Sequence, residues 1–413
     1  MSTIEQNKFT LIKEIIKKYF STAEINEFNK NYLPAFGTAK KISGKKNENH
    51  ADLTLPEDPA LRLETDLLIT FAEQKLDKNK FFDLLLTIGQ ISINTGEFHS
   101  AMDIYNKIIN ETKDNKNYNS LTASAYLSLG DINSRQAKWQ VSLNYVKKAE
   151  EIFEKIKNTT GLAKCNNLLG TIYGETGELK KSKKYFEKSL KLVEHSEDSS
   201  LKGTIEINLG IINCIQGKYD IALAYFQRSL LNFRRINNHN RIAEVKHNAG
   251  MVYIKLGNYD QALNNFDEAV SSALKAGSST ILGIIYVSKA YLFTLRKDFS
   301  LAEAFANKAI DICHKTNDRL SIAEIYKIKG IIHKNKMNYE TSENYFLTSL
   351  RINSELDNKL NYAETNYELA LLCKELGKKQ ESVKYFNNAL KYFKNINAEE
   401  EVKMITENIA SLN

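Results

Sequence analysis

The residue types that most often carry out metal and thiol chemistry, histidine and cysteine, lie scattered along this chain of 413 residues. The seven histidines form no H-E-x-x-H pattern, the spacing that brings two histidines and a glutamate to one helical face around zinc. Cys313 and His314 are adjacent, but neighbouring residues of a helix point about 100° apart. The cysteines include no C-x-x-C pair and are Cys165, Cys214, Cys313 and Cys373. We therefore expect no metal site, no thiol chemistry and no cofactor.

Glycines and carboxylates also lack the spacing of a catalytic or nucleotide site. Gly170, Gly174 and Gly177 match neither the dinucleotide fingerprint nor the P-loop, and no strand pattern precedes them. The carboxylates of residues 399–401 begin a helical stretch, where negative charge complements the helix dipole. The sequence therefore predicts a protein that is not an enzyme and that has no catalytic residue.

Composition and charge narrow the class of protein further. Apolar residues make up 42% of the chain, and no apolar run approaches the roughly 20 residues that span a bilayer. The net charge of +7 comes from lysines spread along the chain, so we do not expect nucleic acid as a partner. The first residues lack the apolar core of a secretory signal, and widely separated cysteines fit reduced thiols. These features favour a cytoplasmic protein without a membrane span.

The elements that position the side chains are indicated by a period of 40 residues. A small residue recurs at this spacing as Gly130, Gly170, Gly210, Gly250, Ala290, Gly330 and Ala370, with Gly89 one residue outside the series. Glycine within a helix costs about 1 kcal/mol relative to alanine, so its recurrence needs a packing reason. We interpret it as the close crossing of one helix over its partner.

Other residues recur with the same period. The second helix of the unit carries an aromatic residue at Phe186, Phe226, Phe266, Phe346 and Phe386. Glycines stand where the first helix must end, and can take the left-handed conformation that closes a helix, at Gly96, Gly177, Gly217, Gly257 and Gly377. The second helix is expected to be capped by Asp220, Asp260 and Ser300. Each unit therefore consists of a helix, a tight turn, a second helix and a longer turn.

The prolines mark where this array begins. All three, Pro34, Pro56 and Pro59, precede the repeated units, so no proline interrupts the helices that follow. We predict an N-terminal segment over residues 1–58, with helices over 4–20 and 23–31 and a flexible linker over 37–58. The helical array is predicted over 59–413, with repeats from about residue 82 and an amphipathic capping helix over about 398–412.

These recurring positions resemble the tetratricopeptide repeat. Gly170, Tyr173, Gly177, Ser182 and Phe186 stand where that family has Gly, Tyr, Gly, Ala and an aromatic residue. The 40-residue period is similar to the longer-helix repeats of kinesin light chain, Pins-type adaptors and bacterial Rap and PlcR-type peptide receptors. The resemblance implies an all-α fold, an α-solenoid that forms a right-handed superhelix of about eight helix pairs with a C-terminal capping helix.

The resemblance also implies a concave groove lined by the first helix of each pair. The groove-facing positions of the family correspond in this chain to Ile207, Asn208, Ile211, Ile215, His247, Asn248, Met251, Ile254, Lys255, Val287 and Tyr291. Exposed apolar surface of this kind usually marks a partner site. Asparagine carboxamides can pair with both the N–H and the C=O of an extended peptide, and Asn208 and Asn248 lie one period apart.

Three interpretations of this groove remain open. It can bind a peptide segment of another protein, it can hold the chain's own N-terminal helices, or its apolar residues can serve only the packing between repeats. The first interpretation favours a non-enzymatic scaffold or adaptor whose partner is a protein or peptide. The alternative function is that of a peptide-gated regulator of the Rap or PlcR type, which acts through its N-terminal helices.

Overall fold

The computed structural model describes residues 15–31, 59–396 and 398–412. Within these residues every regular element is a helix, and no strand occurs. The chain divides into two compact units, residues 1–212 and residues 213–413, and the boundary falls inside helix α10, Ser199–Ile215. In each unit most helices pack on the helices that precede and follow them in the chain.

Unit 1 begins with helical residues 15–19 and 22–31, which pack on helix α3 through the rings of Phe20, Phe28 and Phe71. Tyr19 Oη donates to Asp83 Oδ2 at 2.5 Å and ties the same segment to helix α4. The helices of this unit are α3 (Pro59–Lys75), α4 (Lys78–Thr95), α5 (Phe98–Thr112), α6 (Asn119–Arg135), α7 (Trp139–Lys155), α8 (Thr159–Glu175), α9 (Leu179–Leu192) and the first part of α10, with a short 3₁₀ turn at Lys116–Tyr118. The predicted helix over 4–20 is described only from residue 15, and the predicted linker over 37–58 lies outside the described residues.

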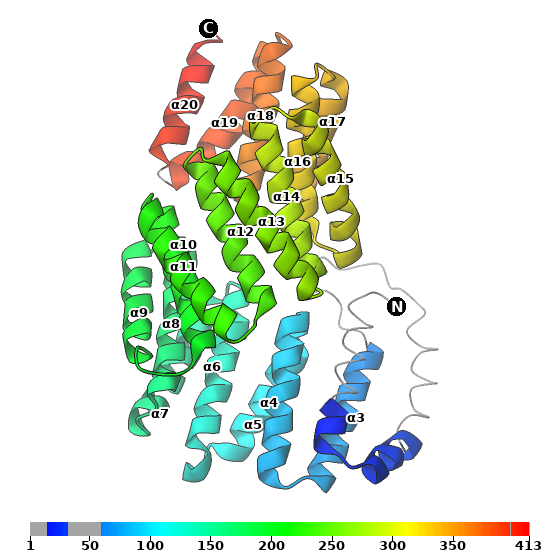
Figure 1. The fold of residues 1–413 in the computed structure, drawn as a ribbon, viewed down its shortest axis with the longest axis vertical. Helices are drawn as coiled ribbons and strands as arrows, with labels where there is room; N and C mark the ends of the chain where they lie inside the picture. The colour runs from blue at the N-terminus through cyan, green and yellow to red at the C-terminus, as the bar shows by residue number, and fades with distance from the viewer. Residues whose placement is uncertain (1–14, 32–58, 397, 413) are drawn as a thin grey trace. The chain divides into compact units, whose positions relative to one another are not determined.

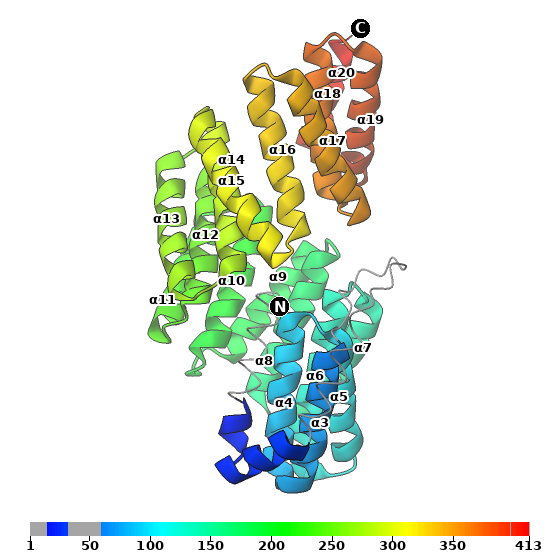
Figure 2. The ribbon, with the colours of Figure 1, turned by 90° about the vertical axis from the view of Figure 1, so that its right-hand side faces the viewer.

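Unit 2 continues the same alternation. Its helices are α11 (Tyr219–Arg235), α12 (His239–Lys255), α13 (Tyr259–Lys275), α14 (Ser279–Leu295), α15 (Phe299–Thr316), α16 (Arg319–Asn335), α17 (Tyr339–Glu355), α18 (Lys359–Glu375), α19 (Lys379–Asn395) and α20 (Glu399–Ala410). Figures 1 and 2 show α12, α14, α16 and α18 as successive neighbours, and each of them packs closely on the helix that follows it. The first helices of successive pairs therefore form one continuous wall of the unit.

The recurring glycines lie where the two helices of a pair cross. A Cβ atom placed on Gly250 would lie 2.5 Å from a ring carbon of Phe266, sixteen residues further along the chain. Gly170 and Gly330 meet a phenylalanine in the same way, at 2.6 and 2.5 Å. Phe266 itself is fully buried. The predicted packing reason for the glycines, a close helix crossing, is confirmed by these contacts.

The two alanines of the series show how far this crossing adapts. Ala290 is followed sixteen residues later by Ala306, so a small residue stands in place of the phenylalanine, and both alanines are buried. Ala370 keeps a phenylalanine partner, Phe386, whose ring is tilted by 57° against Tyr367. One added methyl group is therefore accommodated in two units, in one of them beside a smaller partner.

A serine hydroxyl joins the two helices of several pairs. Ser182 Oγ donates to the carbonyl oxygen of Gly170 at 2.7 Å, and Ser342 Oγ donates to that of Gly330 at 2.8 Å. The same bond recurs at Ser142, and all three serines are fully buried. A buried hydroxyl without a partner would cost about 1–3 kcal/mol. The bond therefore satisfies the serine and fixes the depth at which the second helix crosses the first.

The tight turn inside each pair closes on a residue in the left-handed region. The turn glycines have φ between +70° and +83° and are Gly96, Gly177, Gly217, Gly257 and Gly377. Their predicted role at the end of the first helix is confirmed. Lys297 and Met337 occupy the equivalent turn position without being glycine, and both have φ of +60°. A residue with a Cβ pays about 1–2 kcal/mol for this conformation.

We expect Met337→Gly to stabilise unit 2 by about 1 kcal/mol, because glycine adopts the left-handed conformation without steric strain. The Met337 side chain is 75% exposed, so its removal sacrifices little buried apolar area. Urea unfolding followed by circular dichroism measures the change. Gly257→Met is the matched control, because it makes the reverse change at the equivalent turn and should destabilise by a similar amount. A Met337→Gly variant no more stable than the parent chain would contradict the proposed strain.

The helix caps lie two residues earlier than the sequence analysis predicts. Asn258 Oδ1 accepts a hydrogen bond from the backbone N–H of Gln261 at 3.2 Å and so caps α13, and Asp298 caps α15 in the same way. The predicted caps were wrong, because each lies inside the first turn of its helix: Asp220, Asp260 and Ser300. The aromatic residue before these positions is already helical, so the helix begins before the predicted cap is reached.

Helix α20 packs on α19, and its Ile405 is fully buried. The prediction of an all-α fold built from repeated helix pairs is confirmed. The division of the chain between residues 58 and 59 stays a prediction.

Candidate functional site

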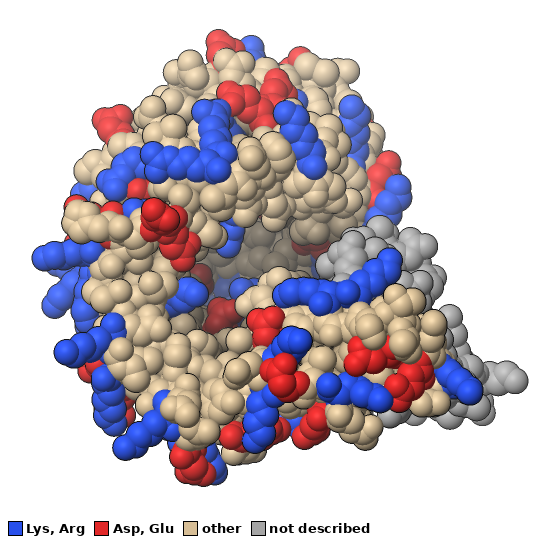
Figure 3. Space-filling model, turned by 60° about the horizontal axis from the view of Figure 1, so that its bottom comes forward, with Lys and Arg blue, Asp and Glu red and all other residues tan. Residues whose placement is uncertain are grey.

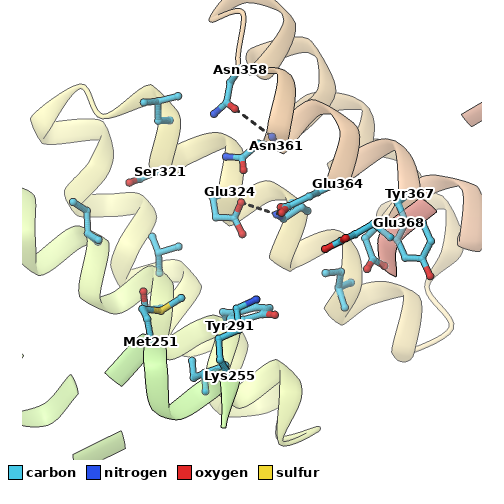
Figure 4. Close-up of a pocket in the computed structure, with 18 of the residues that line it drawn as sticks. Met251, Lys255, Tyr291, Ser321, Glu324, Asn358, Asn361, Glu364, Tyr367 and Glu368 are labelled. Atoms are coloured by element: carbon cyan, nitrogen blue, oxygen red, sulfur yellow. Dashed lines mark hydrogen bonds and ion pairs between the residues drawn. The ribbon is translucent and has the colours of Figure 1, made fainter. Parts of the chain in front are cut away.

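Unit 2 contains a cavity of about 710 Å³. Side chains of α12, α14, α16, α18 and α20 form most of its lining, so it lies along the wall made by the first helices of successive pairs. Figure 4 shows labelled side chains of α12, α14, α16 and α18 that extend into the same space. The volume falls in the range of roughly 300–1,000 Å³ that is usual for ligand sites.

The side of the cavity formed by α12 and α14 is largely apolar. Met251 and Ile254 come from α12, and Val287 and Tyr291 come from α14. Ile284, also on α14, lines the cavity and remains 36% exposed. Burial raises the pKa of Tyr291, so its hydroxyl stays protonated at neutral pH and can donate a hydrogen bond. This side offers an apolar surface that carries a phenolic donor and, on α12, the ammonium group of Lys255.

The side formed by α16 and α18 carries a network of charged groups. Lys327 Nζ lies 2.8 Å from Glu324 Oε2 on the same helix and also pairs with Glu364 of α18. The Lys327 side chain is only 9% exposed. Burial would lower the pKa of Lys327, but the two carboxylates outweigh burial and raise it. Lys327 is therefore a permanent cation that holds α16 to α18.

Further carboxylates and amides lie on the same side. Glu368 Oε2 pairs with Lys334 Nζ at 2.8 Å. Glu401, in the first turn of α20, lines the cavity and makes no ion pair with any described residue. Asn358 Oδ1 accepts from the backbone N–H of Asn361 at 3.2 Å and caps α18. Both asparagines line the cavity and carry amide groups that can pair with a peptide backbone.

His247 connects α12 to α14 at the edge of the apolar side. Its Nε2 lies 2.8 Å from Ser288 Oγ, and its ring lies 5.8 Å from that of Phe266. Burial lowers the pKa of His247 to about 4, so the imidazole is neutral at physiological pH. A neutral imidazole can either donate a hydrogen bond to the Ser288 hydroxyl or accept one from it, and it brings no charge into the cavity.

A second polar pair occupies the corresponding positions in unit 1. Asn208 Nδ2 donates to Asn167 Oδ1 at 3.0 Å, and the two residues lie 41 positions apart, as do His247 and Ser288. The first residue of each pair stands three positions before a recurring small residue, and the second stands two before the next one. The side-chain hydrogen bond between α8 and α10 therefore uses one N–H of the Asn208 carboxamide.

The structure brings part of the predicted groove together. The predicted residues that line the cavity are His247, Met251, Ile254, Lys255, Val287 and Tyr291. Asn248 lies on α12 but is not among the lining residues. Ile207, Asn208 and Ile211 belong to unit 1, while Ile215 belongs to unit 2 and is 59% exposed. That these residues bind a peptide stays a prediction.

The residues predicted to bind a peptide do not include the carboxylates that line the cavity. Glu324 and Glu364 stand six positions before Gly330 and Ala370, which is a groove-facing position in the scheme implied by the resemblance. The register of the repeats is therefore sufficient to predict that these two carboxylates face the groove. Glu401 carried no such signal, since it lies beyond the last repeat and reaches the cavity only because α20 packs on α19.

The described residues contain no group of three or more His, Cys, Asp and Glu side chains that could hold a metal ion. All four cysteines are free thiols, and burial raises the pKa of each. No described helix is long and apolar enough to cross a membrane. On the face drawn in Figure 3, basic and acidic side chains are interspersed.

Three solved structures illustrate the similarity in fold. A Rap protein complexed with competence and sporulation factor has a TM-score of 0.61 at 14% identity, over 91% of this chain and 98% of its own. The apo form of the quorum sensor NprR from B. thuringiensis has a TM-score of 0.61 at 15% identity, over 90% and 99%. The Rap conjugation gene regulator of the plasmid pLS20, in complex with the Phr* peptide, has a TM-score of 0.58 at 18% identity, over 91% and 96%. At these identities the likeness concerns the fold.

Sequence comparison supplies the family. A search of curated proteins finds no match. The family model of the tetratricopeptide repeat matches residues 121–195, 201–275, 241–315 and 321–395, which together cover more than half of the chain. These matches coincide with the helix pairs described above. The chain therefore belongs to the tetratricopeptide repeat family.

Proposed function

We propose that this chain is a non-enzymatic interaction protein and that the cavity of unit 2 binds an extended peptide segment of a partner protein. The observation that carries the proposal is the cavity itself, a space of about 710 Å³ lined by the first helices of successive repeats. Its apolar side offers a surface for apolar side chains, and burial of apolar area there is worth about 25 cal/mol per Å² before ordering costs are subtracted.

The polar groups of the cavity suit a peptide backbone better than a compact apolar ligand. Asn358 and Asn361 provide amide donors and acceptors, and Ser321 provides a hydroxyl. Tyr291 adds a phenolic donor from the opposite side. An extended peptide presents N–H and C=O groups at regular spacing, so donors and acceptors on successive helices can pair with successive residues. One of the structurally similar proteins, the Rap conjugation gene regulator of the plasmid pLS20, is in complex with a peptide, which supports the same class of ligand.

The proposal predicts a specific loss of binding when the apolar side is blocked. Ile284→Arg places a long cationic side chain at a cavity position that is already 36% exposed, so the fold should tolerate it. We expect this variant to bind peptides at least tenfold more weakly than the parent chain. The measurement is retention of a random library of acetylated hexapeptide amides by the immobilised full-length protein, quantified by mass spectrometry.

A matched variant separates a blocked cavity from a general effect of adding arginine. Leu274→Arg makes a similar change at a position of α13 that is 61% exposed and does not line the cavity. Its peptide retention should equal that of the parent chain. Equal retention by Ile284→Arg and the parent chain would remove the cavity as the binding site.

A second candidate function, that of a peptide-gated regulator, is favoured by the packed N-terminal helices. Residues 15–31 are attached to α3 and α4 through Phe20, Phe28 and the bond between Tyr19 and Asp83. Such a segment can transmit a signal if peptide binding changes its attachment. Hydrogen exchange of residues 15–31 with and without bound peptide separates the two functions, since a scaffold requires no change there.

A further inference from the structure

The two sides of the cavity in unit 2 differ in charge. Four carboxylates line it, those of Glu324, Glu364, Glu368 and Glu401, and all come from α16, α18 and α20. The lysines that line it are Lys327, within the acidic side, and Lys255, on α12. Figure 4 shows Lys255 beside Met251 and Tyr291, apart from Glu364 and Glu368. All four carboxylates of the cavity therefore lie at one end, and the other end carries an apolar surface and Lys255.

The carboxylates of the acidic end are not neutralised by the cations around them. The single ammonium of Lys327 is shared between Glu324 and Glu364, and Lys334 pairs with Glu368. Glu401 has no ion-pair partner among the described residues. Two negative charges therefore remain at this end after the pairing is counted. Charges of one sign in a cleft with apolar walls concentrate the electrostatic field on whatever enters it.

We propose that the peptide segment bound by this cavity carries a lysine or arginine whose side chain lies between Glu364 and Glu401. The inference rests on the proposed function and names the chemistry of the segment that the site accepts. An apolar side chain of the same segment then occupies the surface of Met251, Val287 and Tyr291. Charge complementarity excludes phosphate-bearing ligands such as nucleic acid or an anionic membrane surface, because the carboxylates would repel them.

The geometry supports a cation at this place in preference to a neutral polar group. Glu364 remains 41% exposed even though it pairs with Lys327, so part of the carboxylate is accessible from the cavity. A carboxylate accepts several hydrogen bonds, and a guanidinium or ammonium group supplies the donors. Lys327 acts as a positioning residue, because its buried ammonium holds Glu324 and Glu364 on facing helices.

The experiment uses the full-length chain and a positional-scanning library of acetylated hexapeptide amides, in which one position at a time is fixed as one amino acid. Acetylation and amidation remove the terminal charges, so selection by charge reports side chains only. We expect sub-libraries with fixed lysine or arginine to be retained at least tenfold more than those with fixed glutamate at one position. In the Glu364→Gln, Glu401→Gln double variant this ratio should fall to near one, while selection for apolar residues persists.

The control is a matched pair of substitutions on the same two helices. Glu375→Gln and Glu407→Gln change exposed carboxylates of α18 and α20 that do not line the cavity, and this double variant should keep the parent ratio. Because Glu364 also pairs with buried Lys327, its loss can perturb the fold. Glu401→Gln alone breaks no ion pair between described residues and should still reduce the ratio at least threefold.

The possible outcomes separate this inference from the proposed function. Apolar selection without any preference for lysine or arginine in the parent chain would overturn the inference and leave peptide binding intact. An unchanged preference in both Glu401 variants would show that the cation binds elsewhere. If the parent chain retains no sub-library above the level of Ile284→Arg, the proposed function fails, and the inference fails with it.

Discussion

Gly250→Val is expected to destabilise unit 2 by about 3 kcal/mol, the upper end of what overpacking a core usually costs. The first added carbon would lie 2.5 Å from the ring of Phe266, which is fully buried. Valine adds two further methyl groups beyond the single one that Ala370 shows to be tolerated. Hydrogen exchange of the α12 and α13 amides provides the measurement, with more than a hundredfold faster exchange expected.

A double-mutant cycle tests whether the ring is the cause. Phe266→Ala alone should cost about 3–5 kcal/mol, because it leaves a cavity in the core. Combined with Gly250→Val, it should cost much less than the sum of the two single effects, since the valine then occupies part of the vacated space. Ala290 facing Ala306 shows that a crossing without the phenylalanine occurs in this chain. Additive losses would show that Gly250 is constrained by something other than Phe266.

The second large effect is a loss of stability on acidification that depends on His247. Its pKa is about 4 in the folded chain and 6.5 in the absence of burial. Between these values the unfolded chain binds more protons than the folded one, so stability falls as the pH drops from 6.5 to 4. The shift corresponds to at most about 3 kcal/mol. The side chain keeps some exposed surface on the cavity, which makes this figure an upper bound.

The contribution of His247 is isolated by comparison with a variant that cannot titrate. His247→Asn can still hydrogen-bond to Ser288, and its stability should fall less between pH 7 and pH 4.5 than that of the parent chain. Urea unfolding at the two pH values measures the difference, and the carboxylates common to both chains cancel. His314→Asn, at an exposed histidine, should retain the parent pH dependence. A His247→Asn chain with the parent pH dependence would refute the role of burial.

The 40-residue period predicts the helix pairs well because each recurring residue type suits one structural position, either a close helix crossing or a turn. Gly250 can face Phe266 only at a close crossing, and Gly257 is favoured at a turn because of its positive φ. The helix starts are less predictable, since Asn258 and Asp260 are both good capping residues and differ only in position. Which of them caps α13 depends on the residue at which the helix begins, and it begins at Tyr259.

Those residues predicted to bind a peptide that line the cavity lie only on its α12 and α14 side. The apolar positions Met251, Val287 and Tyr291 follow from the register of the repeats, and they do line the cavity. The register of the repeats also places Glu324 at a groove-facing position. A glutamate there is equally typical of an ordinary solvent-exposed helix face. Glu401 could not be found at all, because its place in the cavity depends on how the terminal helix folds back on α19. A carboxylate at a groove position indicates a binding site only when the structure shows which cations already pair with it.

The turn geometry also limits how a chain of this kind can change in length during evolution. In the turn of α12 and α13, Gly257 closes one helix and Tyr259 already begins the next. Loss of a single residue there would rotate the following helix by about 100° and carry Phe266 away from Gly250. Loss or duplication of a whole 40-residue unit leaves every crossing and hydroxyl bond in register. Length variants of such a chain should therefore differ by whole repeats, and single-residue insertions should be confined to the longer turns between pairs.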